Sequence, residues 1–285
     1  MNQSVTIELR QWIVEQAAAG FSRETVMASM VASGWQESVA LKALQATWKE
    51  PATAPHRSTP VVRREGARHL PDLDLSRSPR QIDAGDRMVQ VIASLSQPRV
   101  VVLGNLLGAD ECDALIESAR PQLARSLTVA TKTGGEELNP DRTSSGTFFA
   151  RGQTPEVARI EARIARLLNW PVEHGEGLQV LHYRPGAEYK PHYDYFDPDE
   201  PGTPNILKRG GQRLATLVMY LSEPARGGGT TFPDAGLEVA PVRGNAVFFS
   251  YDRPHPSTRT LHGGAPVIEG DKWVATKWLR EREFI

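Results

Sequence analysis

The chain has 285 residues, a net charge of −1 at pH 7 and an isoelectric point near 6.7. This balance excludes a global electrostatic field that would draw the protein to nucleic acid or to an anionic membrane surface. With 40% hydrophobic and 24% charged residues, the composition is typical of a soluble globular protein of one or two domains. We therefore expect neither nucleic acid nor a membrane among its partners.

The first residues and the cysteine content predict a cytoplasmic protein. Residues 1–15 contain Glu8, Arg10 and Glu15 and lack the basic-then-apolar run of a secretory signal. The sequence has no stretch near the roughly 18 uninterrupted apolar residues that a membrane span needs. Cys112 is the only cysteine, which excludes a disulfide within the chain, and we expect it to be buried on the apolar face of a helix.

Residues 1–50 are expected to form a small all-α module. Apolar residues recur at helical spacing within residues 5–48 and predict three short helices. Gly20 and Gly34 stand where helices would end, and Ser22 is placed to cap the second helix. The pattern resembles the three-helix bundles of the ubiquitin-associated (UBA-like) type, which implies binding to a partner that the sequence does not identify. A helical cap on the next domain is the alternative.

Residues 51–82 differ in composition from what precedes and follows them. Five prolines and six arginines occur there: Pro51, Pro55, Pro60, Pro71, Pro79, Arg57, Arg63, Arg64, Arg68, Arg77 and Arg80. The prolines interrupt any regular element, so the composition predicts an extended linker. A solvated tether is favoured over a segment that binds an acidic partner.

Residues 83–285 are expected to form one α+β domain. Amphipathic helices are predicted over residues 110–119 and 155–168, and an apolar strand over residues 100–103. Short β-branched or aromatic runs then follow between Gly and Pro turns, at residues 178–183, 214–221, 230–232, 237–240, 246–250 and 273–279. So many short strands predict a jelly-roll barrel, with the preceding helices supporting one of its sheets.

The segment YKPHYDYF, residues 189–196, contains a candidate metal site. In a strand, side chains two residues apart point to the same side, so His192 and Asp194 can bind one metal. One imidazole, one carboxylate and a distant third ligand form the facial triad of non-haem Fe(II) oxygenases, which leaves coordination positions open. An H-x-D pair by itself is a weak signal, because most such pairs occur by chance.

Two histidines are candidates for the third ligand. His255 lies between Pro254 and Pro256, and spacing favours His262 only modestly. Lys272 adds an independent clue, because a lysine inside an apolar strand is costly to bury unless it meets an anion. A dicarboxylate that chelates iron through one end would present its other carboxylate to this lysine. A side chain that reaches along the surface into solvent is the alternative.

Several segments in order resemble the catalytic domain of the prolyl 4-hydroxylase family, of the collagen and plant type and with a bacterial-like character. They are RTSSGTFF, LQVLHYRPGAEYKPHYDYF, RLATLVMYLSE, GGGTTFP, APVRGNAVFF and LHGGAPVIEGDKWVATKW, within about residues 98–280. The resemblance implies a double-stranded β-helix, which is the same jelly roll. It also implies a dioxygenase that uses Fe(II), 2-oxoglutarate and O2 and releases succinate and CO2. Ascorbate is a further candidate cofactor.

The resemblance also implies roles for nine residues. The implied iron ligands are His192, Asp194 and His262, the implied cosubstrate contacts are Lys272, Tyr183, Thr230 and Trp278, and the implied substrate contacts are Tyr189 and Arg213. For Tyr183 and Trp278 the alternative is plain core packing, and for Thr230 it is an ordinary strand residue. For Arg213 the alternative is a solvated residue that follows a glycine turn.

Prolyl residues of a protein or peptide are the leading candidates for the substrate. The chain lacks the secretion signal and the peptide-binding domain of the collagen enzymes, and both differences argue against a collagen-like substrate. Two alternatives remain open. One is an oxygenase of the same fold that acts on a free amino acid or another small molecule. The other is a non-catalytic metal-binding sensor or scaffold, although the complete set of His192, Asp194, His262 and Lys272 disfavours it.

Overall fold

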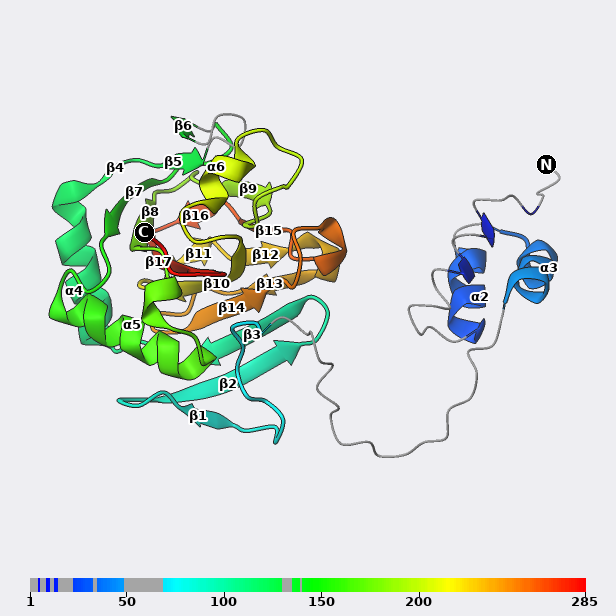
Figure 1. Ribbon diagram of the computed structural model, residues 1–285, viewed down its shortest axis with the longest axis horizontal. Helices are drawn as coiled ribbons and strands as arrows, with labels where there is room; N and C mark the ends of the chain where they lie inside the picture. The colour runs from blue at the N-terminus through cyan, green and yellow to red at the C-terminus, as the bar shows by residue number, and fades with distance from the viewer. Residues whose placement is uncertain are drawn as a thin grey trace. The chain divides into compact units, whose positions relative to one another are not determined.

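The computed structural model describes residue 5 and residues 9–10, 13–14, 23–32, 35–48, 69–129, 135–138 and 140–285. Contacts divide the chain into two compact units, residues 1–67 and residues 68–285 (Figure 1). Among the described helices, none is both long enough and apolar enough to cross a bilayer.

The N-terminal unit contains α2 (Arg23–Ala32) and α3 (Glu37–Thr47). The helices pack through Met30 of α2 and Ala40 and Leu44 of α3, in a core that Leu9 and Ile13 also join. The first of the three predicted helices lies mostly outside the described residues, so the three-helix module stays a prediction. Most of the predicted linker, residues 51–68, also lies outside them.

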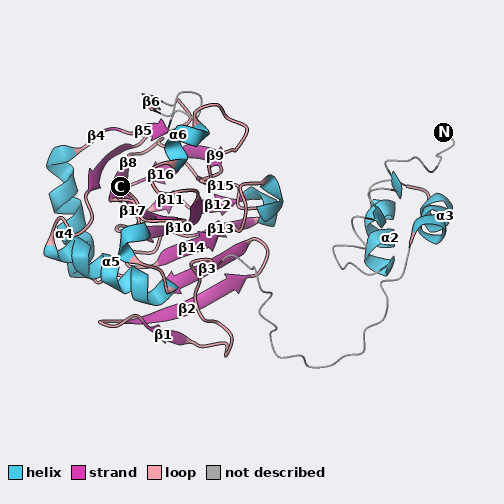
Figure 2. Ribbon diagram, in the orientation of Figure 1, coloured by secondary structure: helices cyan, strands magenta, loops and turns pink. Residues whose placement is uncertain are grey.

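Nine antiparallel strands form the major sheet of the second unit, in the order β1-β2-β3-β14-β10-β17-β8-β7-β4 (Figure 2). Its strands are β1 (Gln81–Asp83), β2 (Met88–Leu95), β3 (Arg99–Gly104), β4 (Ala124–Arg125), β7 (Ser145–Phe149), β8 (Leu178–Tyr183), β10 (Arg213–Tyr220), β14 (Ala246–Ser250) and β17 (Lys272–Arg280). All residues of β8 and β17 are buried, as expected for central strands that are covered on both faces.

A smaller sheet has the order β13-β12-β15-β9. Its strands are β9 (Tyr189–His192), β12 (Thr230–Phe232), β13 (Leu237–Val239) and β15 (His262–Gly264). Two further pairs are β5 (Leu127–Val129) with β6 (Glu136–Leu138), and β11 (Arg226–Gly227) with β16 (Val267–Glu269). The core between the two main sheets includes Phe232 of the smaller sheet and Phe249 and Val274 of the larger one. This is the predicted jelly roll.

The other face of the major sheet is covered by helices. These are α4 (Ala109–Ala119) and α5 (Pro155–Leu168), which lie along one side of the strands in Figure 1. Ile160 and Ile164 of α5 join Leu217 of β10 in a second core. Thr154 caps α5 by accepting a hydrogen bond from the backbone N–H of Val157, which satisfies one of the free donors of the first turn.

The side chains of β17 alternate between the pocket that lies between the two sheets and the apolar core that lies under the helices. Lys272, Val274, Thr276 and Trp278 line a pocket between the sheets, whereas Trp273, Ala275 and Leu279 belong to the core under the helices. Because successive side chains of a strand point to opposite faces, one nine-residue segment serves both a polar site and an apolar core.

The helices predicted over residues 110–119 and 155–168 and the predicted strands from residue 178 onward agree with the structure within one or two residues at each end. The prediction did not include β1, β2, β4–β7, β11, β15 or β16, which are short or partly exposed, nor the short helix α6 (Thr203–Leu207). One expectation about the metal site was wrong: β9 ends at His192, so Asp194 lies in the turn that follows and not in the strand.

Candidate active site

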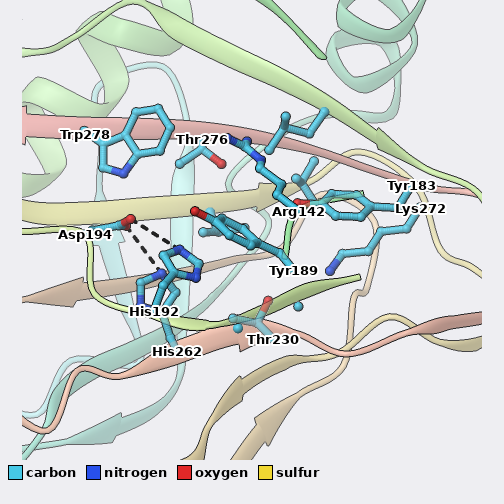
Figure 3. A pocket seen from close by; sticks show the side chains of 15 residues that line it. Arg142, Tyr183, Tyr189, His192, Asp194, Thr230, His262, Lys272, Thr276 and Trp278 are labelled. Carbon is cyan, nitrogen blue, oxygen red and sulfur yellow. Dashed lines mark ion pairs between the residues drawn. The ribbon is translucent and has the colours of Figure 1, made fainter. Parts of the chain in front are cut away.

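A pocket between the two sheets contains most of the predicted site residues (Figure 3). Its lining consists of Arg142, Leu181, Tyr183, Tyr189, His192, Asp194, Val218, Thr230, His262, Gly263, Gly264, Lys272, Val274, Thr276 and Trp278. Strands β8, β10 and β17 of the major sheet supply one wall, and β9, β12 and β15 supply the other.

Strand pairing brings the two predicted histidine ligands together. His262 begins β15 and His192 ends β9, and the two are direct partners in the register of these strands. Asp194 lies beside both, with Oδ1 3.5 Å from His192 Nε2 and Oδ2 3.4 Å from His262 Nε2 (Figure 3). The candidate ligand atoms all lie within 4.8 Å of one another. Two imidazoles and one carboxylate form a donor set that suits Fe(II).

The hydrogen bonds of the two imidazoles match those of metal ligands. His192 Nδ1 lies 2.9 Å from the carbonyl oxygen of Lys190, and His262 Nδ1 lies 2.9 Å from that of Thr260. A carbonyl can only accept, so each Nδ1 donates its hydrogen, and in a neutral imidazole Nε2 then carries the lone pair that binds a metal. Metal-bound histidines are usually held in this way by a partner on the other ring nitrogen. The residues present therefore fit a divalent metal ion.

The electrostatics of the cluster favour the protonation states that bind metal. Burial, reinforced by His262, lowers the pKa of His192, which favours the neutral form of its imidazole. Burial alone raises the pKa of Asp194. The neighbouring His262 and His192 outweigh that effect and hold this pKa well below its usual range. A neutral imidazole and an ionised carboxylate are the forms that coordinate cations.

His255, the other candidate for the third ligand, lies elsewhere. Its side chain is exposed, and its Nδ1 accepts a hydrogen bond from the backbone N–H of Ser257 over 3.1 Å. This contact caps a short turn of 3₁₀ helix over Pro256–Thr258. Among the described residues, the group of side chains that could hold a metal ion contains His262 and not His255.

Lys272 is a buried cation without a partner in the part of the chain that the structure describes. Its side chain is 3% exposed, and Nζ lies 5.2 Å from the centre of the Tyr183 ring. Burial lowers the pKa of Lys272 to about 8, and the carboxylate of Glu238 opposes that effect only in part. Such low exposure excludes a lysine that reaches into solvent, and an unpaired ammonium at this depth marks a site for an anion.

Thr230 lies in the same pocket and has a buried tyrosine behind it. The hydroxyl of Tyr220 donates to Thr230 Oγ1 over 2.8 Å. Because this bond uses only an acceptor site of Thr230, its hydroxyl hydrogen remains available to a ligand. Trp278 is 8% exposed, and its indole N–H has no hydrogen-bond partner among the described residues. Thr230 and Trp278 therefore each offer a hydrogen-bond donor.

The two predicted substrate contacts differ in their surroundings. Tyr189 lines the pocket and stacks on His192 with ring centres 3.7 Å apart. Arg213, in contrast, is not part of the lining. Its guanidinium forms two hydrogen bonds with Glu176, of 2.6 and 2.9 Å, and lies 4.1 Å from the centre of the Trp278 ring. Arg213 is thus buried and paired and is not a solvated turn residue.

Two polar residues of the lining were given no role from the sequence. Arg142 begins the RTSSGTFF segment, and its guanidinium lies 5.0 Å from the centre of the Tyr189 ring. Thr276 lies four residues after Lys272 in β17, so the period of the strand already placed it on the same face. Nothing local in the sequence identifies Arg142, because its position depends on the pairing of distant segments.

Comparisons with known proteins identify the family of the chain. Residues 178–280 match the model of the 2OG-Fe(II) oxygenase superfamily. Prolyl 4-hydroxylase 5 of Arabidopsis thaliana is 45% identical over 221 residues, which cover 70% of this chain and 74% of that relative. Probable prolyl 4-hydroxylase 10 of the same plant is 44% identical over 231 residues, which cover 74% and 78%.

Among solved structures, the viral collagen prolyl hydroxylase of Paramecium Bursaria Chlorella virus-1, in its 2OG complex, is 30% identical with a TM-score of 0.49. The match covers 64% of this chain and 95% of that one. The curated relatives named above are plant proteins, so they do not support the bacterial-like character expected from the sequence. Identity above 40% over most of both chains establishes the relationship: this chain belongs to the prolyl 4-hydroxylase family of 2OG-Fe(II) oxygenases.

Proposed function

We propose that the protein is an Fe(II)- and 2-oxoglutarate-dependent dioxygenase that hydroxylates prolyl residues of a protein or peptide. The observation that carries this proposal is the combination, in one pocket, of a two-histidine, one-aspartate cluster and a buried ammonium that has no ion-pair partner among the described residues. The cluster suits Fe(II), and the ammonium suits the end of a dicarboxylate that is remote from the metal. A metal-binding sensor would have no need for the buried ammonium of Lys272.

Each part of the pocket has a role in this proposal. His192, Asp194 and His262 hold the metal, while Lys272 binds the far carboxylate of 2-oxoglutarate and Thr230 donates a hydrogen bond to it. When bound, Fe(II) and 2-oxoglutarate together supply the oxidising chemistry that is typical of the family. The apolar side chains of the lining keep water away from the cosubstrate, which strengthens its charge-assisted hydrogen bonds.

The substrate would approach from the side of the aromatic residues. Tyr189 stacks on His192, and the guanidinium of Arg142 lies over the Tyr189 ring. We propose that these two side chains and the free indole N–H of Trp278 orient the residue that is hydroxylated. For Arg213 we propose support of Trp278 and not contact with the substrate, because Glu176 already satisfies its charge.

The names of the plant relatives support prolyl residues as the substrate class. The test is incubation of the full chain with Fe(II), 2-oxoglutarate and proline-rich peptides, followed by mass spectrometry for the gain of one oxygen. Matched peptides with alanine in place of proline and free L-proline serve as controls. Oxygen gained only on prolyl peptides supports the proposal. Hydroxylation of free proline alone would favour a small-molecule oxygenase, and no turnover with any of them would contradict the proposed substrate.

A further inference from the structure

Strand β10 carries a threonine whose hydroxyl reaches the carboxylate of the metal cluster. Thr216 is fully buried, and its Oγ1 donates to Asp194 Oδ2 over 2.7 Å. An ionised carboxylate can only accept, so the single hydrogen of the Thr216 hydroxyl is committed to this bond. The hydroxyl therefore restrains the rotation of the Asp194 carboxylate.

Tyr251, just after β14, lies behind this threonine. Its hydroxyl is 3.1 Å from Thr216 Oγ1, and its side chain is 2% exposed. Because the hydrogen of Thr216 is already used, Tyr251 must be the donor in this second bond. The two hydrogen bonds thus run in one direction, from Tyr251 to Thr216 and from Thr216 to Asp194. We call this pair of bonds the hydroxyl relay.

Asp194 needs such support more than the other two ligands. His192 and His262 lie in paired strands, whereas Asp194 lies in the turn beyond β9, where no strand ladder restrains it. Its backbone carbonyl accepts a hydrogen bond of 3.4 Å from Arg213, which is the first residue of β10. The side chain depends on Thr216, three residues further along the same strand.

We infer that Thr216, supported by the hydroxyl of Tyr251, is a positioning residue that orients the carboxylate of Asp194 for metal binding. The inference rests on the proposed function, because it requires a metal at His192, Asp194 and His262. Partners that hydrogen-bond to metal ligands typically contribute roughly 10- to 100-fold to metal affinity, because they fix the ligand in its binding orientation. A threonine with only a packing role would affect stability and leave that affinity unchanged.

The test is titration of the metal-free full chain with Co(II), without 2-oxoglutarate, followed by absorption spectroscopy. Thr216→Val removes the hydroxyl at nearly constant shape, and we expect it to weaken Co(II) binding roughly 10- to 100-fold and to shift the Co(II) absorption bands. Thr216→Ser keeps the hydroxyl and should bind within about threefold of the wild type. Tyr251→Phe should weaken Co(II) binding by a smaller factor, since the hydrogen bond from Thr216 to Asp194 remains.

Thr203→Val is the matched control. Thr203 is equally buried and donates to the backbone carbonyl of Asp197 over 2.6 Å, outside the metal cluster, so its loss should leave Co(II) affinity unchanged. Wild-type affinity in Thr216→Val would overturn the inference. Should that variant not fold, Tyr251→Phe decides, with wild-type affinity and spectrum again contradicting the relay. Failure of the wild type to bind Co(II), or binding retained in His262→Ala, would instead contradict the proposed metal site itself.

Discussion

Lys272 and Arg213 are buried cations on the neighbouring strands β17 and β10, and they differ in what faces them. Arg213 meets the carboxylate of Glu176, whereas Lys272 has no partner among the described residues. Burial of an ammonium without a counter-ion costs several kcal/mol in general, so it persists where a ligand compensates for it. At the scale of single residues, the unpaired charge therefore distinguishes a binding residue from a structural one.

The pKa of Lys272 makes cosubstrate binding depend on pH. The charged form binds the carboxylate, and the pKa of about 8 means that this form is lost as the pH rises through 8. We expect the KM for 2-oxoglutarate to be constant below about pH 7 and to rise by about tenfold per pH unit above 8. Succinate release measured against 2-oxoglutarate concentration from pH 6.5 to 9.5 checks this.

Lys272→Arg is the matched variant for that experiment. A guanidinium stays charged from pH 6.5 to 9.5. If Lys272→Arg still binds 2-oxoglutarate, its KM should therefore not rise above pH 8. Lys272→Ala should raise the KM roughly thirtyfold or more at pH 7, because truncating one partner of a desolvated charge pair costs about 2–5 kcal/mol. Fe(II) affinity should hardly change. An unchanged KM in Lys272→Ala would contradict the role of this lysine.

The metal ligands permit an equally specific test. His192→Ala, Asp194→Ala and His262→Ala each remove one of three donors, so each should abolish turnover of 2-oxoglutarate and reduce Fe(II) binding. His255→Ala is the control, because this histidine is exposed and only caps a turn. Calorimetric titration with Fe(II) without oxygen measures the binding. Activity retained in His262→Ala but lost in His255→Ala would mean that the third ligand is misassigned.

At the scale of elements, the site depends on where strands begin and end. Pairing of β9 with β15 places His192 opposite His262, and the start of β10 holds the turn that carries Asp194. Glu176 is the anchor of that region: it lies between Arg213 of β10 and Arg280 of β17, with hydrogen bonds of 2.6 and 2.9 Å. This buried group joins the ends of two central strands beside the metal cluster.

Removing one cation from this anchor should destabilise the protein measurably. Arg213→Met removes one of the two described ion-pair partners of the buried Glu176 carboxylate, Arg213 and Arg280, and we expect the free energy of unfolding to fall by about 3 kcal/mol. Arg226→Met is the control, since its pair with Glu269 is exposed on both sides and should contribute little. Denaturant unfolding of both variants measures the difference. Equal stability of the two variants would contradict the role of Glu176 as an anchor.

At the scale of the whole molecule, the second unit, residues 68–285, includes residues that precede its first strand, β1. We call this unit the catalytic unit. Leu73 is buried in the core under the helices, and Asp72 forms an ion pair of 2.7 Å with Arg99 of β3. The segment that precedes β1 therefore packs on the catalytic unit, although its composition predicted part of an extended linker. The predicted domain boundary at residue 83 stays a prediction.

Shortened chains test where the catalytic unit begins. A chain that starts at Arg68 should fold and turn over 2-oxoglutarate like the full chain, because residues 68–285 form a compact unit. A chain that starts at Asp83 loses Leu73, and we expect its free energy of unfolding to fall by about 2–3 kcal/mol. Thermal melting of the two chains measures this. Equal melting temperatures would mean that residues 68–82 do not contribute to the core.

Much of this architecture was predictable because the information is local. The alternation of β17 and the helical period of α5 each depend on residues a few positions apart, and period alone assigns their faces. The predicted strands within residues 178–280 agree with the observed ones because they depend on such local patterns. The roles of individual site residues came from the resemblance to the family, and they stay predictions until the variants are measured.

Only the tertiary structure decided which distant groups meet. Arg213 and Glu176 are 37 residues apart and Thr216 and Tyr251 are 35 apart, and no local pattern links either pair. The amino-acid sequence by itself determined the class of elements, the positions of most central strands along the chain and the candidate ligands. Burial and long-range strand pairing then determined that no described residue pairs with Lys272, that Glu176 neutralises Arg213, and that β10 holds Asp194. These outcomes depend on contacts between segments that are far apart in the sequence and meet only in the folded chain.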